Sequence, residues 1–155
     1  MEDLAAGRAA TWDVVGDFFS LMAGIEVPVK DPVRAGTQLA GLAATYELTV
    51  YESFLPDLAA HGRVEIDAGE VIRRLDGLLE GILGAAVDDL TVVMTSDHGN
   101  FEDRSARGHT RNAVPLLAVG PAVANPHEKS RLASTIICSL CLLQIVFRVL
   151  RSMSS

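Results

Sequence analysis

A strand, helix and strand pattern in the middle of the chain constrains the fold more than any other feature. Leu48 to Phe54 is rich in β-branched and aromatic residues and has the length of a strand. Asp67 to Ala85 carries a continuous apolar stripe behind a capping box formed with Glu70, which predicts an amphipathic helix. The apolar run Leu90 to Met94 predicts a second strand. We therefore expect a right-handed crossover in an α/β fold, with a mainly parallel sheet flanked by helices.

The flanking segments add further predicted elements to this unit. Bulky apolar residues recur at three- and four-residue steps from Met1 to Ala23, which predicts an amphipathic helix. Asp31, followed by a proline, is typical of a helix start, and that helix extends to about Tyr46. Val114 to Gly120 predicts a third strand, and Pro115 near its beginning favours an edge position.

The C-terminal part has a different character. Leu132 to Phe147 contains no charged residue, and its apolar side chains surround a helical wheel on all sides. The run is shorter than the roughly 20 residues that a membrane helix needs. We expect a main domain of residues 1–125 and an atypical apolar helix within residues 126–155. The rest of the fold, a partner or a second copy of the chain would cover residues 132–147, with membrane association as the alternative.

Composition excludes several classes of function. A chain of 155 residues suffices for one compact domain, and its net charge of −7 argues against a nucleic-acid surface. Cys138 and Cys141 lie in an apolar run without other metal ligands, which favours core thiols over a redox or zinc pair. Met1 to Ala10 lacks the apolar region of a signal peptide, so we expect a cytoplasmic location.

The first two predicted strands are each followed by a carboxylate and an imidazole. Asp57 and His61 follow the first strand at a spacing of four, which puts both on one face if the chain is helical there. Asp97 and His98 follow the second strand, and His109 comes after a charged loop. Because parallel strands end at one edge, these groups can meet. Carboxylate and imidazole ligands suit manganese, zinc or iron better than calcium, and five of them suit a two-ion catalytic site.

Each residue also has a purely structural interpretation. Asp57 can cap a short helix that begins at Leu58, with His61 merely exposed on it. Asp97 can cap the following turn, and His98 can hydrogen-bond to backbone. Three of the chain's four histidines nevertheless fall at predicted strand ends on one edge, which favours the metal interpretation. The remaining histidine, at position 127, has no such setting and is expected at the surface.

These motifs resemble a known superfamily. Asp97-His98-Gly99-Asn100, then His109-Thr110 and Asn112-Ala113-Val114-Pro115, are similar to the C-terminal metal-binding segment of the alkaline phosphatase superfamily. Asp57-Leu58-Ala59-Ala60-His61 resembles the upstream Asp-x-x-Gly-His element of the branch that contains cofactor-independent phosphoglycerate mutase. The three pieces occur in the family's order and cover roughly Tyr46 to Gly120.

The resemblance implies a divalent-metal-dependent activity on a phosphorylated small molecule, either phosphoryl transfer or phosphate-ester hydrolysis. Asp57, His61 and His109 correspond to the ligands of one ion, and Asp97 and His98 to part of the shell of a second, with manganese or zinc as the expected metals. In the family the ions flank a serine or threonine nucleophile and stabilise charge on the phosphoryl group.

Three departures from the family pattern limit that expectation. The family's first strand carries a metal-binding aspartate, with the nucleophile further on, and neither has a counterpart before Asp57. Ala60 stands where the family element has glycine, and the tail after Arg131 differs from the usual closing helix. We therefore expect a partial domain that binds one or two ions, with a catalytically silent metal-binding or interaction module as the alternative.

Three arginines in the charged loop are candidates for contacting substrate phosphate. They are Arg104, Arg107 and Arg111, of which Arg111 is the preferred candidate. A solvated role in an exposed loop is the alternative for all three.

Overall fold

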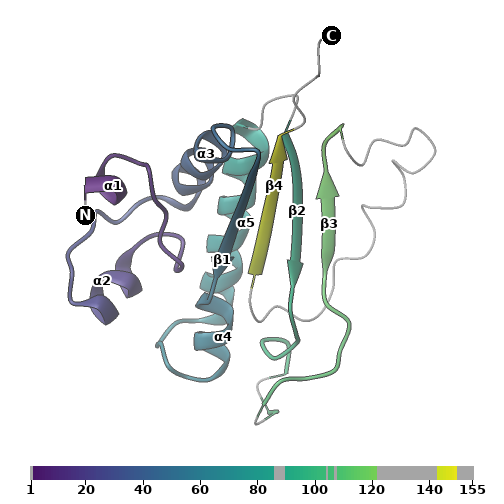
Figure 1. The fold of residues 1–155 in the computed structure, drawn as a ribbon. Helices are drawn as coiled ribbons and strands as arrows, with labels where there is room; N and C mark the ends of the chain where they lie inside the picture. Colours follow the sequence, from purple (N-terminus) through teal and green to yellow (C-terminus); the bar gives the residue numbers. More distant parts are fainter. Residues whose placement is uncertain (1, 86–89, 104, 107, 122–142, 150–155) are drawn as a thin grey trace.

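The structure is a computed structural model that describes residues 2–85, 90–103, 105, 106, 108–121 and 143–149 (Figure 1). It contains one four-stranded sheet and a layer of helices. The elements in chain order are α1 (Glu2–Ala5), α2 (Asp17–Ala23), α3 (Pro32–Ala43), β1 (Leu48–Ser53), α4 (Leu55–Ala60), α5 (Ala68–Ala85), β2 (Leu90–Ser96), β3 (Leu116–Val119) and β4 (Leu143–Val149).

The strands lie in the order β1-β4-β2-β3, and every neighbouring pair is antiparallel. The register places Tyr51 opposite Ile145, Ile145 opposite Met94, and Met94 opposite Leu117. Because β1 and β2 are each antiparallel to β4, they run in the same direction, although they are not neighbours. Their C-terminal ends therefore lie at the same edge of the sheet (Figure 1).

The α/β class is confirmed, but the predicted parallel pairing is absent from the described strands. One error explains the difference: residues 143–149, expected within an apolar helix, form β4 and separate β1 from β2. This segment is rich in β-branched residues, which favour strands, and Ile145 is completely buried. Periodicity alone does not separate a buried strand from a buried helix in such an apolar run. The remainder of the predicted helix, its boundary at residue 126, both cysteines and His127 lie outside the described residues.

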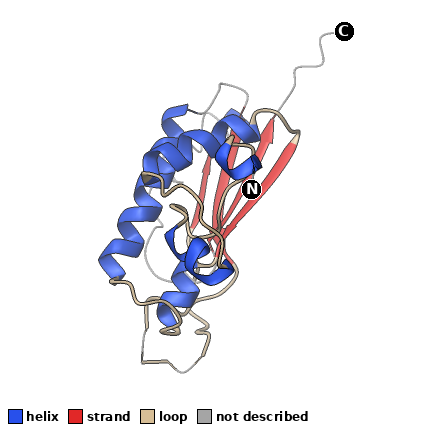
Figure 2. Cartoon of the chain, turned by 90° about the vertical axis from the view of Figure 1, so that its left-hand side faces the viewer, coloured by secondary structure: helices blue, strands red, loops and turns tan. Residues whose placement is uncertain are grey.

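The helices cover one face of the sheet (Figure 2). Helices α3 and α5 pack directly on each other, and their apolar residues join those of the sheet in a single core. Two glycines allow this close approach. A Cβ atom on Gly36 would lie 2.0 Å from the Leu78 carbonyl oxygen, and one on Gly81 would lie 2.0 Å from the Val33 carbonyl oxygen.

Several local predictions are confirmed. The Asp31 carboxylate accepts hydrogen bonds from the backbone amides of Val33, at 3.0 Å, and Arg34, at 3.2 Å, and so caps α3. Helix α5 and strands β1 and β2 begin and end close to the predicted positions. Strand β3, which follows Pro115, lies at an edge of the sheet as its proline indicates.

The N-terminal segment does not form the single helix expected over residues 1–23. A loop separates α1 from α2, and within it Val14 (φ 74°) and Gly16 (φ 100°) have left-handed backbone that a continuous helix excludes. Strand β1 holds this loop. The Tyr51 hydroxyl donates to the Thr11 carbonyl at 2.8 Å, and the Ser53 hydroxyl donates to the Trp12 carbonyl at 2.7 Å.

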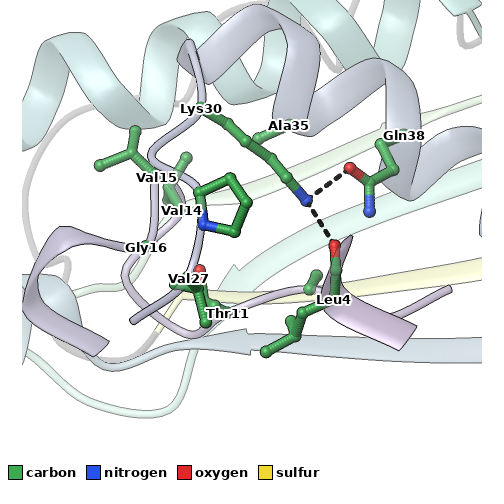
Figure 3. A pocket seen from close by; sticks show the side chains of 11 residues that line it. Leu4, Thr11, Val14, Val15, Gly16, Val27, Lys30, Ala35 and Gln38 are labelled. Atoms are coloured by element: carbon green, nitrogen blue, oxygen red, sulfur yellow. Dashed lines mark hydrogen bonds between the residues drawn. The ribbon is translucent and has the colours of Figure 1, made fainter. Parts of the chain in front are cut away.

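Lys30 ties the N-terminus to α3 (Figure 3). Its ammonium donates to the Leu4 carbonyl at 3.3 Å and to Gln38 Oε1 at 2.7 Å, and the Gln38 amide donates to the Ala9 carbonyl at 3.1 Å. Partial burial, reinforced by the charge of Arg34, lowers the pKa of Lys30. The cavity beside these residues is about 20 Å³, which is room for about one water molecule and excludes a ligand.

Arg74 of α5 connects this helix to α2 through Asp17. Its side chain is only 11% exposed and donates to both Asp17 carboxylate oxygens at 2.8 Å and to Glu70 at 2.9 Å. Its guanidinium also lies 5.4 Å from the centre of the Phe18 ring. Burial by itself would raise the pKa of Asp17, but the hydrogen bonds from Arg74 outweigh it and the pKa is lowered. Helix α2 is therefore fixed by a paired charge.

No described helix covers the opposite face of the sheet (Figure 2). Leu48 and Val50 of β1 and Leu116 of β3 project there and are 61%, 56% and 53% exposed. None of the helices in the described part of the chain has the length and apolar character needed to cross a membrane.

The contact between α3 and α5 yields a stability prediction. Gly36→Ala should lower the free energy of unfolding by about 1–3 kcal/mol, because the added methyl group would overlap the backbone of α5. Gly41→Ala in the same helix meets nothing within 4 Å and should raise stability by about 0.5–1 kcal/mol. Urea denaturation of both variants measures the difference, and equal stabilities would contradict the close packing.

Candidate metal centre

The first two candidate ligands lie on α4, immediately after β1. Asp57 is in the first turn of this helix and His61 is its C-terminal cap residue, so the four-residue spacing places both on one face. His61 Nε2 lies 3.3 Å from Asp57 Oδ1, and the two side chains are 27% and 24% exposed. The helix begins at Leu55, so Asp57 is not the cap of a helix starting at Leu58.

Asp97 and His98 follow β2 at the same edge of the sheet. The Asp97 carboxylate accepts a hydrogen bond from the His98 backbone amide at 2.9 Å, and its other oxygen lies 3.4 Å from His98 Nε2. The Ser96 hydroxyl donates to the His98 carbonyl at 2.9 Å. The bond from the His98 amide to Asp97 is of the local kind expected if Asp97 only caps a turn. Together these contacts hold both side chains at the end of the strand.

A short antiparallel bridge brings His109 back to this strand end. Gly99 and Thr110 pair with each other, and the Thr110 amide donates to the Gly99 carbonyl at 2.7 Å. The His109 ring then stacks on His98, with ring centres 3.4 Å apart and planes at 15°. Its centre lies 5.9 Å from that of the His61 ring. The loop thus joins the two strand ends into one site.

Asp57, His61 and His109 form the candidate metal triad. Each offers one ligand atom, and these atoms all lie within 4.8 Å of one another. Among the described residues this is the one group of three or more carboxylate, imidazole or thiol side chains with such geometry. His98 adjoins the triad through its stacking on His109, and Asp97 adjoins it through its contact with His98. Metal ligation by these five residues stays a prediction.

Two residues in the site were not identified from the sequence. Asn100 is almost completely buried, and its side-chain nitrogen lies 3.0 Å from His61 Nε2. Glu102 accepts hydrogen bonds from the backbone amide of Asn100 at 2.8 Å, from the Thr110 hydroxyl, and from the Asn112 side chain at 2.9 Å. Glu102 therefore links both ends of the loop that carries His109. In sequence, Asn100 is an ordinary turn residue and Glu102 one charge among several.

The arginines add less to the site. Arg111 is exposed and directly follows Thr110 of the bridge that closes the loop. Arg104 and Arg107 lie outside the described residues. A role for Arg111 in binding substrate phosphate stays a prediction.

The donor set of the triad fits a divalent transition metal. One carboxylate and two imidazoles are ligands that zinc and manganese accept, and all three side chains keep some access to solvent. Structural zinc sites use four protein ligands, whereas three protein ligands leave a position for water or substrate. The number of ligands in the triad is thus the number that catalytic zinc sites have, one fewer than in structural zinc sites.

Comparison with known proteins gives consistent matches. The chain is 33% identical over 128 residues to the phosphopentomutase of Methylobacterium radiotolerans, which covers 77% of this chain and 31% of that protein. It is 35% identical over 66 residues to the phosphopentomutase of Clostridium tetani, covering 43% of this chain and 17% of that protein. The phosphopentomutase of Hahella chejuensis is 24% identical over 122 residues, covering 77% and 28%. No solved structure matches the chain.

The chain thus spans about a third or less of the length of these curated relatives. Residues 33–140 match the metalloenzyme superfamily, a segment that includes the triad, Asp97 and His98. Because this match covers more than half of the chain, the chain belongs to the metalloenzyme superfamily, which confirms the alkaline phosphatase-like assignment made from its motifs.

Proposed function

We propose that this chain binds a divalent metal ion through the triad and takes part in phosphoryl transfer or phosphate-ester hydrolysis on a phosphorylated small molecule. The observation that carries the proposal is the convergence of Asp57, His61 and His109. They come from two segments far apart in sequence, and their ligand atoms lie within 4.8 Å of one another.

The residues of the site have different roles in holding metal ions. Asp57 contributes negative charge that offsets the charge of the ion, and His61 and His109 contribute neutral nitrogen ligands. Asp97 and His98 would form part of the shell of a second ion. Manganese or zinc, when bound, supplies positive charge that stabilises the phosphoryl group. The stacking of His98 on His109 keeps the two groups of ligands in contact.

The comparisons support a mutase-like reaction. The relatives named above are phosphopentomutases, and a mutase of that name acts on a phosphorylated sugar. For this chain, phosphoryl transfer between two hydroxyl groups and hydrolysis of the ester are both consistent with the triad, since each requires the same charge stabilisation.

A catalytically silent metal-binding or interaction module is the second candidate function. The observation in its favour is that the sequence before Asp57 offers no counterpart of the family's metal-binding aspartate or of its nucleophile. Metal binding is common to both candidates, whereas turnover separates them.

The triad yields a prediction for metal affinity. Asp57→Asn and His61→Ala should each weaken binding of manganese and zinc by more than about 100-fold, because each removes a ligand, and loss of an outer partner alone typically costs about 10–100-fold. Isothermal titration calorimetry measures the affinities. Asp76→Asn, an exposed acid on α5, serves as the control and should bind metal like the unmodified chain. Unchanged affinity in the triad variants would contradict the proposal.

Turnover of a generic phosphate ester tests the enzymatic function. We expect hydrolysis that depends on manganese or zinc and is lost in Asp97→Ala, because the second ion would lose a carboxylate ligand. A rate that persists in Asp97→Ala would contradict the site as proposed. Metal binding without any rate in the unmodified chain would support the silent module.

Glu102 yields a prediction about loop closure. Glu102→Ala should weaken metal binding by about 10–100-fold, because three hydrogen bonds that position Asn100 and the His109 loop are lost. Glu102→Gln retains the side-chain length and one carbonyl acceptor and should fall between the alanine variant and the unmodified chain. The same titrations provide the measurement, with the exposed Glu80→Ala as control. Full affinity in Glu102→Ala would show that the loop positions His109 without this carboxylate.

A further inference from the structure

A pocket next to the metal triad combines aromatic walls with a single cation. Trp12, Phe19, Met22, Phe54, Leu58 and Arg63 line it, together with Asp57 of the triad. We call it the aromatic pocket. Its volume is about 460 Å³, within the range of small-molecule sites. Three of the chain's eight aromatic residues (one Trp, two Tyr and five Phe) line this one pocket.

Buried polar contacts fix the walls of the aromatic pocket. The Ser53 hydroxyl, which is fully buried, holds the Trp12 carbonyl at 2.7 Å. Asp13 is also fully buried and accepts hydrogen bonds from the backbone amides of Gly16, at 3.1 Å, and Phe19, at 2.9 Å. The backbone that carries two of the three aromatic rings is therefore held in place before any ligand arrives, which lowers the entropic cost of binding.

Helix α2 is held against the body of the protein as well. The ion pair between Arg74 and Asp17 joins the start of this helix to α5. Phe19 and Met22 of α2 line the aromatic pocket from that side. The contacts of Asp13 and Arg74 thus both help to hold this wall of the aromatic pocket.

The charged residues that line the aromatic pocket indicate how a ligand would be oriented in it. Arg63 is the one cation of the pocket lining, and no acid of the described residues forms an ion pair with it. Asp57 also lines the pocket and would repel an anion when no metal is bound. A ligand that suits both ends carries a flat apolar portion against the rings and a phosphate toward Arg63 and the triad.

We infer that the aromatic pocket binds the alcohol portion of a phosphate monoester, and that this portion contains a flat unsaturated ring, as in a nucleoside monophosphate or an aryl phosphate. Stacking of a ring on aromatic side chains contributes binding that does not depend on metal. The phosphate end of the inference rests on the proposed function, whereas the ring end does not.

The single tryptophan of the chain lines the pocket, so its fluorescence reports binding directly. Adenosine, adenosine monophosphate and ribose 5-phosphate should be titrated with and without zinc. We expect adenosine to change Trp12 fluorescence to the same extent in both conditions. With zinc, adenosine monophosphate should bind at least about tenfold more tightly than ribose 5-phosphate, because stacking of one base typically contributes that much or more.

Two variants assign the effects to the pocket. Phe54→Leu should weaken the binding of adenosine monophosphate by about tenfold and leave the affinity for ribose 5-phosphate unchanged. The variant should still fold, since Phe54 is 42% exposed and its replacement keeps an apolar side chain. Tyr46→Leu removes a 57% exposed ring outside the pocket and is the control. Arg63→Gln should weaken the binding of adenosine monophosphate but not that of adenosine. Arg34→Gln, at another exposed arginine, is its control.

The outcomes separate the two proposals. Equal affinity for adenosine monophosphate and ribose 5-phosphate, or no effect of Phe54→Leu on any ligand, would overturn the ring inference. A third outcome is that zinc alters no titration while adenosine still binds and Phe54→Leu weakens this binding. It would support the ring inference and contradict the proposed metal-dependent function.

Discussion

The candidate site depends on the pairing of β4 with both β1 and β2. Each of these two strands is antiparallel to β4, so they share a direction and end at the same edge of the sheet. Helix α4 then places Asp57 and His61 beyond one end, and the β2 end supplies Asp97 and His98 beyond the other. Strand β4 thus fixes the separation of these two strand ends and gives the ligands a common frame.

The loop after β2 completes the site by turning back on itself. The bridge between Gly99 and Thr110 and the hydrogen bonds to Glu102 bring His109 against His98 and within reach of Asp57. An exposed loop gains little from apolar burial, so polar contacts must offset the entropy of ordering it. The site is therefore built from a rigid edge and one loop, which the Gly99–Thr110 bridge and the Glu102 carboxylate hold closed.

Sequence reasoning succeeded where the signal is local. The spacing of Asp57 and His61, the Asp31 cap and the helix over α5 all depend on neighbours within a few residues. Sequence reasoning failed where the structure of a segment depends on partners far away in sequence. The apolar run at 143–149 pairs with two strands far away in sequence, so its strand state, and with it the antiparallel sheet, could not be read from periodicity. For the same reason Glu102 was overlooked, because its hydrogen-bond partners lie across the loop.

Anomalous diffraction from crystals grown with zinc tests the central claim most directly, because it locates the metal without reference to activity. The account predicts a strong peak bounded by the Asp57 carboxylate and the imidazoles of His61 and His109. A peak elsewhere, for example at His127 or the two cysteines, with none among these three side chains, would contradict it.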